Sequence, residues 1–294
     1  MGLSVYLNGK FVDRDKAYVS IFDHGLLYGD GVFEGIRSYS GLVFRLKGHI
    51  DRLYRSASAI QLVIPMKKDA LMKAVVATLK KNKLKDAYIR LVVTRGPGDL
   101  GLDPRKCRHG RVIFIIADKV ALYPERYYRE GLHIITAKTR RNLPQALNPR
   151  IKSLNYLNNI LAKLEATKSG VEEALMLTHD GYVAECTGDN IFIVSKKTLI
   201  TSPTKIGALE GITRDAVISI AKKRKIIFRE KKFKLNEVYK ADECFLTGSA
   251  AEIVPVVRID KKTIGRGKPG KLTLELRDEF RKLTKIDGIK YKID

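Results

Sequence analysis

The chain has 294 residues, of which 45% are hydrophobic, and a formal net charge of +24 at pH 7. This length and composition are typical of a folded, soluble protein with one large or two moderate domains. The longest apolar runs, 112–117 and 253–257, are far shorter than the roughly 20 residues that a membrane helix needs. A membrane-spanning helix is therefore not expected.

Neither a targeting segment nor a metal site is expected. Residues 1–10 show no basic region followed by an apolar core, which predicts a cytoplasmic protein. Cys107, Cys186 and Cys244 lie far apart and show no ligand-like spacing to one another or to the five histidines. We therefore expect neither a disulfide framework nor a structural metal ion.

The excess of 56 Lys and Arg over 32 Asp and Glu makes a basic nucleic-acid-binding protein an alternative. The densest basic run, 222–234, is interleaved with Ile226, Ile227, Phe228 and Phe233, which is typical of a core strand with a solvated edge. A helix-turn-helix, zinc-finger or RRM signature is absent from the sequence. The alternative is therefore unfavoured, and the surplus charge also suits attraction of anionic substrates and of a phosphorylated cofactor.

The first part of the chain alternates strand and helix patterns. Asn8-Gly9 between two apolar runs predicts a β-hairpin with a type I′ turn. A glycine-dense segment at 23–37 would let the backbone approach a ligand or another subunit closely. The elements expected after it are helices over 45–62 and 69–82, a strand over 87–94, a long loop over 96–104 and a strand over 112–117.

Lys152 lies between a proline-containing loop and a helical pattern. Apolar residues recur at helical spacing at Leu157, Ile160, Leu161 and Leu164, which predicts a helix over 153–167 with Lys152 at its entrance. A lysine acts as a nucleophilic amine when desolvation or a cationic neighbour lowers its pKa from about 10.4. Lys152 is therefore our candidate catalytic residue.

The remainder of the chain is expected to form a second domain. Strands are predicted over 132–139, 173–178, 182–184, 191–194 and 244–246, with a polar loop at 185–190 and a small turn at 247–252. A helix is predicted from about residue 212 to 224, and the amides at its start can accept a phosphate. We thus expect one domain over 1–118, a linker over 119–131 and a second domain over 132–294.

Taken together, these features supply the groups that pyridoxal 5′-phosphate requires. Lys152 offers an amine for the cofactor aldehyde, and Glu185 offers a carboxylate for the pyridine nitrogen. Arg52 and the two turns at 210–213 and 247–250 offer donors for the phosphate. Each feature alone is a weak signal, and the prediction depends on the set.

Seven short motifs carry a family resemblance: Tyr28–Arg37, His49–Leu53, Tyr88–Arg90, Lys152–Leu157, Glu185–Phe192, Gly211–Arg214 and Thr247–Ile253. In this order they resemble the class IV pyridoxal-phosphate aminotransferases, and within them the branched-chain amino acid aminotransferases. The resemblance implies the two-domain α+β fold of D-amino-acid aminotransferases, known as fold type IV. It also implies an active site at the domain interface.

The resemblance implies a role for each matched residue. Lys152 would form the Schiff base with the cofactor and move a proton between the substrate Cα and the cofactor C4′. Glu185 would face the pyridine nitrogen and Tyr156 the 3′-oxygen. The other cofactor contacts would come from Arg52, Leu209, Gly211, Ile212, Thr213, Gly248 and Ser249.

The substrate pocket would be lined by Tyr28, Phe33, Gly35, Arg37, Tyr88, Arg90, Leu102, Tyr123, Ser249 and Ala250. Tyr28 and the loop near Leu102 would reach the site of the neighbouring subunit, which implies at least a homodimer. Apolar walls stabilise Leu, Ile and Val side chains by about 0.8 kcal/mol per buried methylene. Arg90 with Tyr88 would bind the second carboxylate of glutamate.

We therefore predict an enzyme that transfers the amino group of branched-chain L-amino acids to 2-oxoglutarate by a ping-pong mechanism. A D-amino acid aminotransferase and an aminodeoxychorismate lyase share the lysine and the glutamate, and both remain alternatives. Ser249 stands where many relatives have Thr, and Leu91 stands where Pro is common. The spacing from Lys152 to Tyr156 also varies within the family, which leaves the role of Tyr156 more open.

Overall fold

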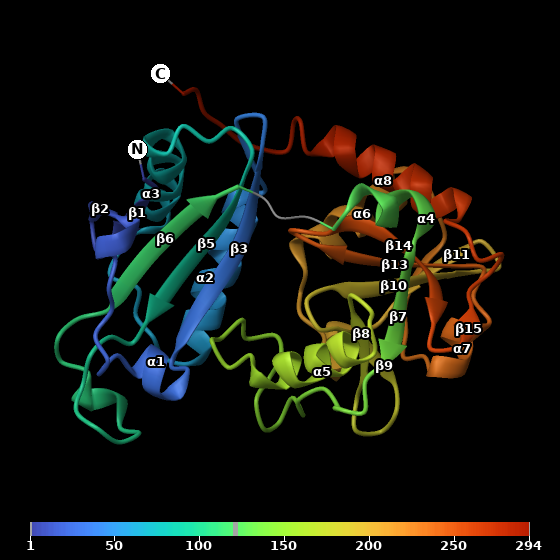
Figure 1. Cartoon of the computed structure of the whole chain (residues 1–294), viewed down its shortest axis with the longest axis horizontal. Helices are drawn as coiled ribbons and strands as arrows, with labels where there is room; N and C mark the ends of the chain where they lie inside the picture. Colours follow the sequence, from blue (N-terminus) through green and yellow to red (C-terminus); the bar gives the residue numbers. More distant parts are fainter. Residues whose placement is uncertain (1, 120–122, 294) are drawn as a thin grey trace. The chain divides into compact units, whose positions relative to one another are not determined.

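The computed structural model describes residues 2–119 and 123–293, which form two compact units. The first unit comprises the described residues up to 119 together with 151–155 and 284–293, and the second comprises 123–150 and 156–283 (Figure 1). The expected domains were continuous in sequence, with boundaries at 118 and 132. The first unit also includes two later segments, 151–155 and 284–293. As a consequence, Lys152 belongs to the first unit and the helix that follows it belongs to the second.

The described part of the first unit contains a seven-stranded antiparallel sheet in the order β16-β4-β3-β5-β6-β1-β2. Its strands are β1 (Ser4–Leu7), β2 (Lys10–Asp13), β3 (Gly31–Tyr39), β4 (Leu42–Phe44), β5 (Ala87–Thr94), β6 (Val112–Asp118) and β16 (Gly288–Lys290). The predicted hairpin is confirmed, because β1 pairs with β2 and both turn residues, Asn8 and Gly9, have positive φ angles of 47° and 90°.

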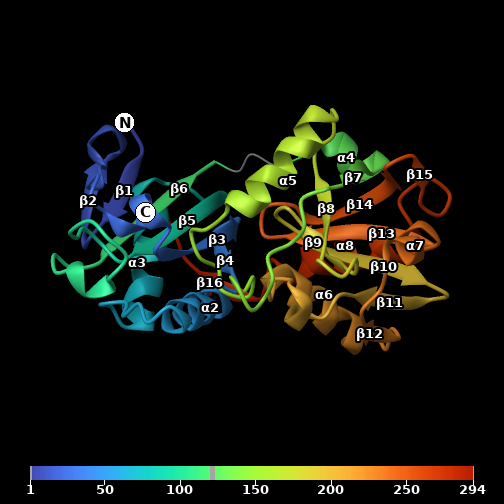
Figure 2. The same cartoon turned by 90° about the horizontal axis from the view of Figure 1, so that it is seen from below.

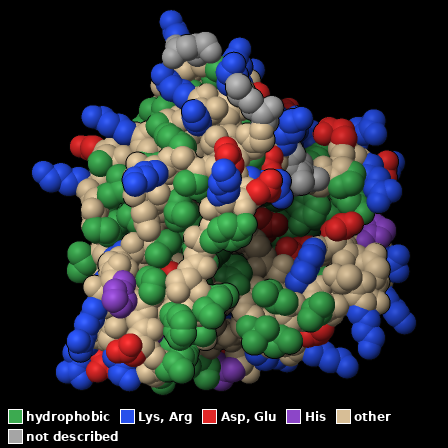
Figure 3. All heavy atoms as spheres, turned by 60° about the vertical axis from the view of Figure 1, so that its left-hand side comes forward, with side chains coloured by type: hydrophobic (Ala, Val, Ile, Leu, Met, Phe, Trp, Pro, Cys, Tyr) green, Lys and Arg blue, Asp and Glu red, His purple; other side chains and the backbone are tan. Residues whose placement is uncertain are grey.

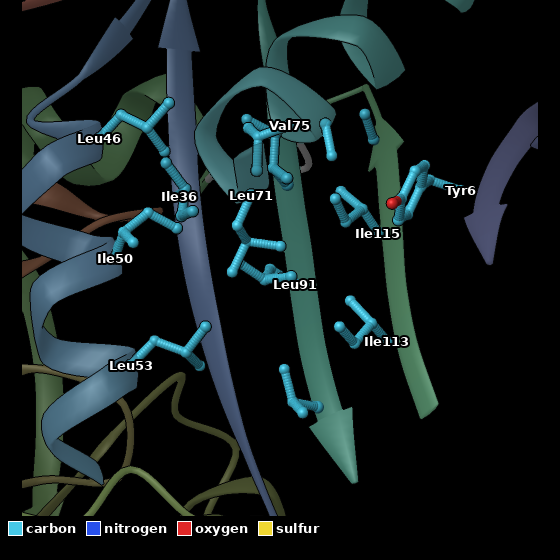
Figure 4. Packing of buried hydrophobic residues seen from close by; sticks show 14 of the residues in the cluster. Tyr6, Ile36, Leu46, Ile50, Leu53, Leu71, Val75, Leu91, Ile113 and Ile115 are labelled. Atoms are coloured by element: carbon cyan, nitrogen blue, oxygen red, sulfur yellow. The ribbon is translucent and has the colours of Figure 1, made fainter. Parts of the chain in front are cut away.

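Two helices, α2 (Leu46–Ala59) and α3 (Lys68–Lys81), pack on one face of this sheet (Figure 2). Their apolar residues meet those of the central strands, and Figure 4 shows this core. The labelled core residues come from α2 (Leu46, Ile50, Leu53), α3 (Leu71, Val75), β3 (Ile36), β5 (Leu91), β6 (Ile113, Ile115) and β1 (Tyr6). The side chains on the opposite face of β3 and β5 do not belong to this hydrophobic core.

Shorter helices complete the first unit. They are α1 (His24–Tyr28) and the two 3-10 helices Arg14–Lys16 and Pro104–Lys106. At the end of the chain β16 pairs with β4, and the hydroxyl of Tyr291 donates to the carbonyl of Leu84 at 2.6 Å. The last strand therefore extends the edge of the first sheet, a pairing that we did not predict.

The second unit contains a sheet in the order β12-β11-β10-β13-β14-β7-β8-β9, with β15 paired to β14. The strands are β7 (Leu132–Thr136), β8 (Ala174–Leu177), β9 (Val183–Cys186), β10 (Asn190–Ser195), β11 (Thr198–Thr201), β12 (Phe228–Glu230), β13 (Glu243–Gly248), β14 (Glu252–Ile259) and β15 (Lys262–Thr263). Parallel pairs join β14 to β7, β7 to β8 and β11 to β12, and the other pairs are antiparallel.

The helices of the second unit are α4 (Glu125–Glu130), α5 (Leu157–Lys168), α6 (Ile212–Lys223), α7 (Leu235–Tyr239) and α8 (Lys271–Leu283), with a 3-10 helix at Thr204–Ile206. Helices α6 and α8 contact each other and strand β13. Most of the segment expected as a linker belongs to this unit, because α4 packs on β14 and buries Tyr128. Residues 120–122 of that expected linker lie outside the described residues.

The helix expected over 153–167 is shorter at its start, because α5 begins at Leu157. Residues 151–155 instead contact β3 through the bridge between Val32 and Ser153 and two further backbone hydrogen bonds, so Lys152 lies before α5 in a segment attached to the first sheet. The apolar residues that predicted the helix face outward: Leu157, Ile160, Leu161 and Leu164 are all exposed. Buried positions on α5 are held instead by Asn159, Ala162 and Ala166.

Basic side chains are spread over the surface. Figure 3 shows Lys and Arg side chains across the visible face, with fewer Asp and Glu side chains between them, and no single basic patch on that face. Among residues 2–119 and 123–293, no group of three or more His, Cys, Asp or Glu side chains could hold a metal ion. In the same residues, every helix is too short or too polar to span a bilayer.

Glu243 of β13 caps helix α8, and its removal is expected to destabilise the second unit. Its Oε1 accepts from the amide of Leu272 at 3.0 Å, and its Oε2 accepts from the amide of Thr273 at 2.8 Å. Glu243→Ala leaves these helix-start amides without an acceptor, so the free energy of unfolding should fall by about 1–2 kcal/mol in urea denaturation. Glu279→Ala, at a partly exposed residue of α8 that pairs with Lys282, is the control, and an equal loss in both variants would contradict the capping role.

Candidate active site

Strands β3 and β5 present predicted substrate residues on one face of the first sheet. Gly35 pairs with Arg90 and Arg37 with Tyr88, so these residues share a face with Phe33. The guanidinium of Arg90 lies 4.5 Å from the centre of the Phe33 ring and 5.8 Å from that of Tyr88. This face therefore combines aromatic surface with a positive charge.

Gly35 is required on this face because the Tyr88 hydroxyl approaches the backbone there. A Cβ atom on Gly35 would lie 2.0 Å from Tyr88 Oη and 2.9 Å from Cζ. Any larger residue would displace the tyrosine ring, so the pair Gly35 and Tyr88 sets the position of the phenol.

Lys152 is attached to the first unit through its backbone. Its carbonyl accepts from the Phe33 amide at 3.0 Å, and its amide donates to Ser56 Oγ of α2 at 3.1 Å. Ser153 forms a β-bridge with Val32. The side chain then places Nζ 4.5 Å from the centre of the Phe33 ring, on the face that also holds Arg90.

Arg52 of α2 is fixed by a buried carboxylate. Its Nε and Nη2 donate to the two oxygens of Glu34 at 2.8 and 2.7 Å, and Glu34 also contacts His49 Nδ1 at 2.7 Å. Burial alone would raise the pKa of Glu34, but the charges and hydrogen bonds of Arg52 and His49 lower it to about 2. Burial lowers the pKa of His49, against the opposing effect of Glu34, and the charges of Arg52 and Lys152 add to this lowering.

Tyr28 and the loop of Leu102 lie together in the first unit. The Tyr28 hydroxyl accepts from the amide of Gly101 at 3.0 Å, and the Tyr28 ring packs edge-on against His24. The neighbouring Leu102 side chain is 81% exposed. The structure thus brings together two elements that the resemblance assigns jointly to a neighbouring subunit.

Glu185 of β9 is the corresponding buried carboxylate of the second unit. Its Oε1 accepts from Arg141 Nε at 3.0 Å and forms an ion pair with Arg141 Nη2 at 2.9 Å. Its Oε2 accepts from Asn190 Nδ2 at 3.0 Å and from the Leu209 amide at 2.9 Å. A buried carboxylate is tolerated because charge and hydrogen bonds compensate its lost hydration.

The two turns that the resemblance assigns to the cofactor are closely packed by neighbouring side chains. Gly211 is the N-cap of α6 and precedes the amides of Ile212 and Thr213. A Cβ atom on Gly211 would lie 2.0 Å from Asn190 Oδ1, and one on Gly248 would lie 1.8 Å from Asp189 Oδ1. Both turns therefore need glycine for steric reasons.

The remaining predicted residues also lie in the second unit. Ser249 and Ala250 are partly exposed between β13 and β14, and Tyr156 immediately precedes α5. Tyr123 packs against the core that contains Tyr128. Burial, followed by the charges of Asp189 and Glu173, raises the pKa of the Tyr123 phenol.

These groups fit pyridoxal phosphate. The first unit offers an amine for the aldehyde and a guanidinium for the phosphate, and the second unit offers a helix N-terminus for a phosphate and a buried carboxylate for the ring nitrogen. In addition, Thr247 is 1% exposed and its hydroxyl has no hydrogen-bond partner among the described residues. A buried hydroxyl of this kind, two residues before Ser249, is consistent with a ligand site.

We did not predict from the sequence the residues that fix the predicted site residues in place by hydrogen bonds and ion pairs. Glu34, His49 and Asn190 lie within the quoted motifs, but we assigned them no role. Arg141 lies outside every motif, and nothing in its sequence context distinguishes it from the many surface arginines. The glycine at 211 was the available signal for Asn190, because a required glycine indicates a close neighbour.

Comparison with known proteins identifies a family whose members this chain resembles. Residues 31–259 match the family described as amino-transferase class IV. A putative branched-chain-amino-acid aminotransferase of Methanocaldococcus jannaschii is 51% identical over 288 residues, which cover 98% of this chain and 99% of that protein.

Solved structures also match the chain over almost its whole length. The branched-chain amino acid aminotransferase of Escherichia coli superimposes with a TM-score of 0.93 at 33% identity, covering 97% of this chain and 95% of that one. The T.th. branched-chain amino acid aminotransferase, complexed with N-(5′-phosphopyridoxyl)-L-glutamate, gives a TM-score of 0.90 at 35% identity, with coverage of 97% and 95%. The predicted fold type IV is thereby confirmed.

The pKa of Glu34 predicts a pH-dependent stability. Because that pKa falls from the ordinary 4.5 to about 2 on folding, the ionised carboxylate stabilises the fold above about pH 4.5, and this stabilisation disappears as the pH falls toward 2. Glu34→Gln should therefore destabilise the chain most near neutral pH, and its difference from the unchanged chain should shrink below pH 4.5. Urea denaturation across this range measures the effect, with the exposed Asp13→Asn as the control. A pH-independent difference would contradict the assignment.

Proposed function

The chain belongs to the class IV aminotransferase family, and we propose on this basis that it transfers the amino group of branched-chain L-amino acids to 2-oxoglutarate with pyridoxal 5′-phosphate as cofactor. The names of the relatives support the substrate class. The observation that carries the proposal is the attachment of Lys152 to β3, which fixes its amine beside Phe33 and Arg90. When bound, the cofactor supplies an aldehyde and an electron sink for a negative charge at the substrate Cα.

Lys152 is proposed to carry out the covalent and proton-transfer work. Its Nζ would hold the cofactor through the aldehyde, and as a free amine it would accept the proton from the substrate Cα. The backbone bonds to Phe33 and Ser56 hold the main chain in place, so that the side chain alone swings during this transfer.

Glu185 and Arg52 are proposed to hold opposite ends of the cofactor. Glu185 would face the ring nitrogen and favour its protonated form, and Arg141 balances the charge of the Glu185 carboxylate. Arg52, oriented by Glu34, would bind the phosphate from the first unit. In the second unit, the amides at the start of α6 would bind a phosphate.

The face of β3 and β5 is proposed to select the substrates. The Phe33 ring offers apolar contact to a Leu, Ile or Val side chain, and each buried methylene contributes about 0.8 kcal/mol. Arg90, stacked on Phe33, offers the cation that a second carboxylate of glutamate or 2-oxoglutarate needs. The solved relative complexed with phosphopyridoxyl-L-glutamate supports glutamate as the second amino acid. Both substrates then use one pocket in turn, as a ping-pong mechanism requires.

We also propose that the chain forms at least a homodimer. The exposed apolar face of α5, made by Leu157, Ile160, Leu161 and Leu164, is unusual for a helix of a monomer. The paired elements at Tyr28 and Leu102 likewise carry exposed apolar side chains. A second copy of the chain would cover such surfaces and complete the pocket with Tyr28.

Half-reactions test the substrate proposal. L-Leucine and L-glutamate should each convert the cofactor absorbance of the purified protein to that of the amino form, whereas D-alanine should leave it unchanged. Conversion by D-alanine but not by L-leucine would replace this proposal with a D-amino acid aminotransferase. A colourless protein that binds DNA or RNA in a salt-sensitive way would reject the enzyme altogether.

Replacement of Lys152 tests the catalytic assignment. Lys152→Ala should lower the rate of the L-leucine half-reaction by about 10²–10⁴-fold or more, because both the amine and the proton carrier are lost. Lys10→Ala on β2 is the matched control and should react normally. Borohydride reduction followed by mass spectrometry should label Lys152, and a label on another lysine would refute the assignment while sparing the reaction class.

Charge placed on α5 tests the homodimer. Leu161→Glu should weaken self-association, because burying an unpaired carboxylate in an apolar interface is unfavourable. Light scattering after size exclusion should then show a smaller mass than for the unchanged chain. Val63→Glu, at another exposed apolar residue, is the control. An unchanged mass for Leu161→Glu would exclude this face as the interface.

A further inference from the structure

Asn190 contacts both parts of the second unit that we assign to the cofactor. Its buried side chain donates through Nδ2 to Glu185 Oε2 and to the carbonyl of Leu209, each at 3.0 Å. The amide of Leu209 donates to the same Glu185 oxygen at 2.9 Å. Asn190, Glu185 and Leu209 therefore close a ring of hydrogen bonds, in which none of the three can move alone.

The other atom of the Asn190 amide packs against the start of helix α6. A Cβ atom on Gly211 would lie 2.0 Å from Asn190 Oδ1, and Gly211 has an ordinary φ of −69°. Glycine is therefore needed here for space rather than for backbone conformation. The amide of Asn190 lies between the Glu185 carboxylate on one side and the N-cap of α6 on the other.

Thr247 supplies an independent sign that this region binds a ligand. It is opposite Asn190 in the register of β10 and β13, and β13 contacts α6. Its hydroxyl is buried and has no hydrogen-bond partner among the residues that the structure describes. Such a group costs free energy unless a ligand atom or a water molecule satisfies it.

We propose that Asn190 is a positioning residue that couples the two ends of the cofactor site. An anion bound at the N-terminus of α6 orders the turn from Leu209 to Gly211. The hydrogen bonds of Asn190 and of the Leu209 amide then fix the Glu185 carboxylate, which is proposed to bind the ring nitrogen. Binding at the two ends is then mutually favourable, and by thermodynamic linkage the effect is the same in both directions. The inference rests on the proposed use of pyridoxal phosphate.

The coupling can be measured with the two halves of the cofactor separated. The whole chain, freed of pyridoxal phosphate, is titrated with pyridoxamine, which lacks both the phosphate and the aldehyde, in the absence and presence of saturating inorganic phosphate. For the unchanged chain we expect phosphate to tighten pyridoxamine binding about 5-fold or more. For Asn190→Ala we expect this factor to fall below about 2.

Asn159→Ala is the matched control. Asn159 accepts from Arg141 Nη1 at 3.0 Å and donates to the Thr187 carbonyl at 2.7 Å, so it supports the other side of Glu185. It should weaken pyridoxamine binding and leave the effect of phosphate intact. Loss of coupling in Asn159→Ala to the same extent as in Asn190→Ala would overturn the proposal, as would full coupling in Asn190→Ala.

If Asn190→Ala does not fold, Gly211→Ala tests the proposal in its place. Its methyl group displaces Asn190 without removing any hydrogen-bonding group, so it should also reduce the coupling. In a folded double variant, Gly211→Ala should have little further effect, because the obstructing Oδ1 is gone. Coupling retained in Gly211→Ala would likewise reject the role of Asn190. If the unchanged chain binds no pyridoxal phosphate, the proposed function fails; if it transaminates but shows no coupling, only this inference fails.

Discussion

The backbone pairing of residues 151–155 with β3 is the constraint on which the proposed chemistry depends. Phe33 donates to the Lys152 carbonyl, and Leu154 donates to the carbonyl of Gly31, so the segment is attached to β3 and is not part of helix α5. The lysine amine lies beside the Phe33 ring, on the face that also holds Arg90, and the sheet holds the backbone from which this side chain extends.

In each unit, a buried carboxylate is also held by a buried guanidinium. Glu34 pairs with Arg52 in the first unit, and Glu185 pairs with Arg141 in the second. We propose that Arg52 of the first pair and Glu185 of the second pair contact the cofactor. Breaking either pair leaves an uncompensated charge in the interior, which is strongly unfavourable. The pairs therefore fix two groups of opposite charge at defined positions before any ligand arrives.

The sequence predicted element types better than it predicted contacts. The Asn8-Gly9 turn and helices α2 and α3 follow from local rules, because turn chemistry and helical periodicity depend on near neighbours. The start of α5 was placed too early, since the pairing of 151–155 with β3 is a long-range contact that overrides the helical pattern. The apolar spacing on α5 indicated a helix but could not show which face is exposed.

The candidate site shows the same limit. Motif resemblance selected Lys152, Glu185 and Arg52, whereas the residues that hold them were found only in three dimensions. Arg141 is separated from Glu185 by 44 positions, and no local pattern relates the two. The pairing of β16 with β4 was missed for the same reason, because Gly288–Lys290 is a short strand with a weak pattern of its own.

That last strand has a consequence for how the molecule is made. Residues 284–293 complete the first unit, although the rest of its sheet is encoded before residue 156. During synthesis from the N-terminus, β4 therefore stays an open edge until nearly all of the second unit has left the ribosome. An unpaired edge strand is a template for pairing with other chains. The nascent first unit depends on late closure by residues 284–293, and rapid pairing of β16 would limit the time for which β4 is exposed.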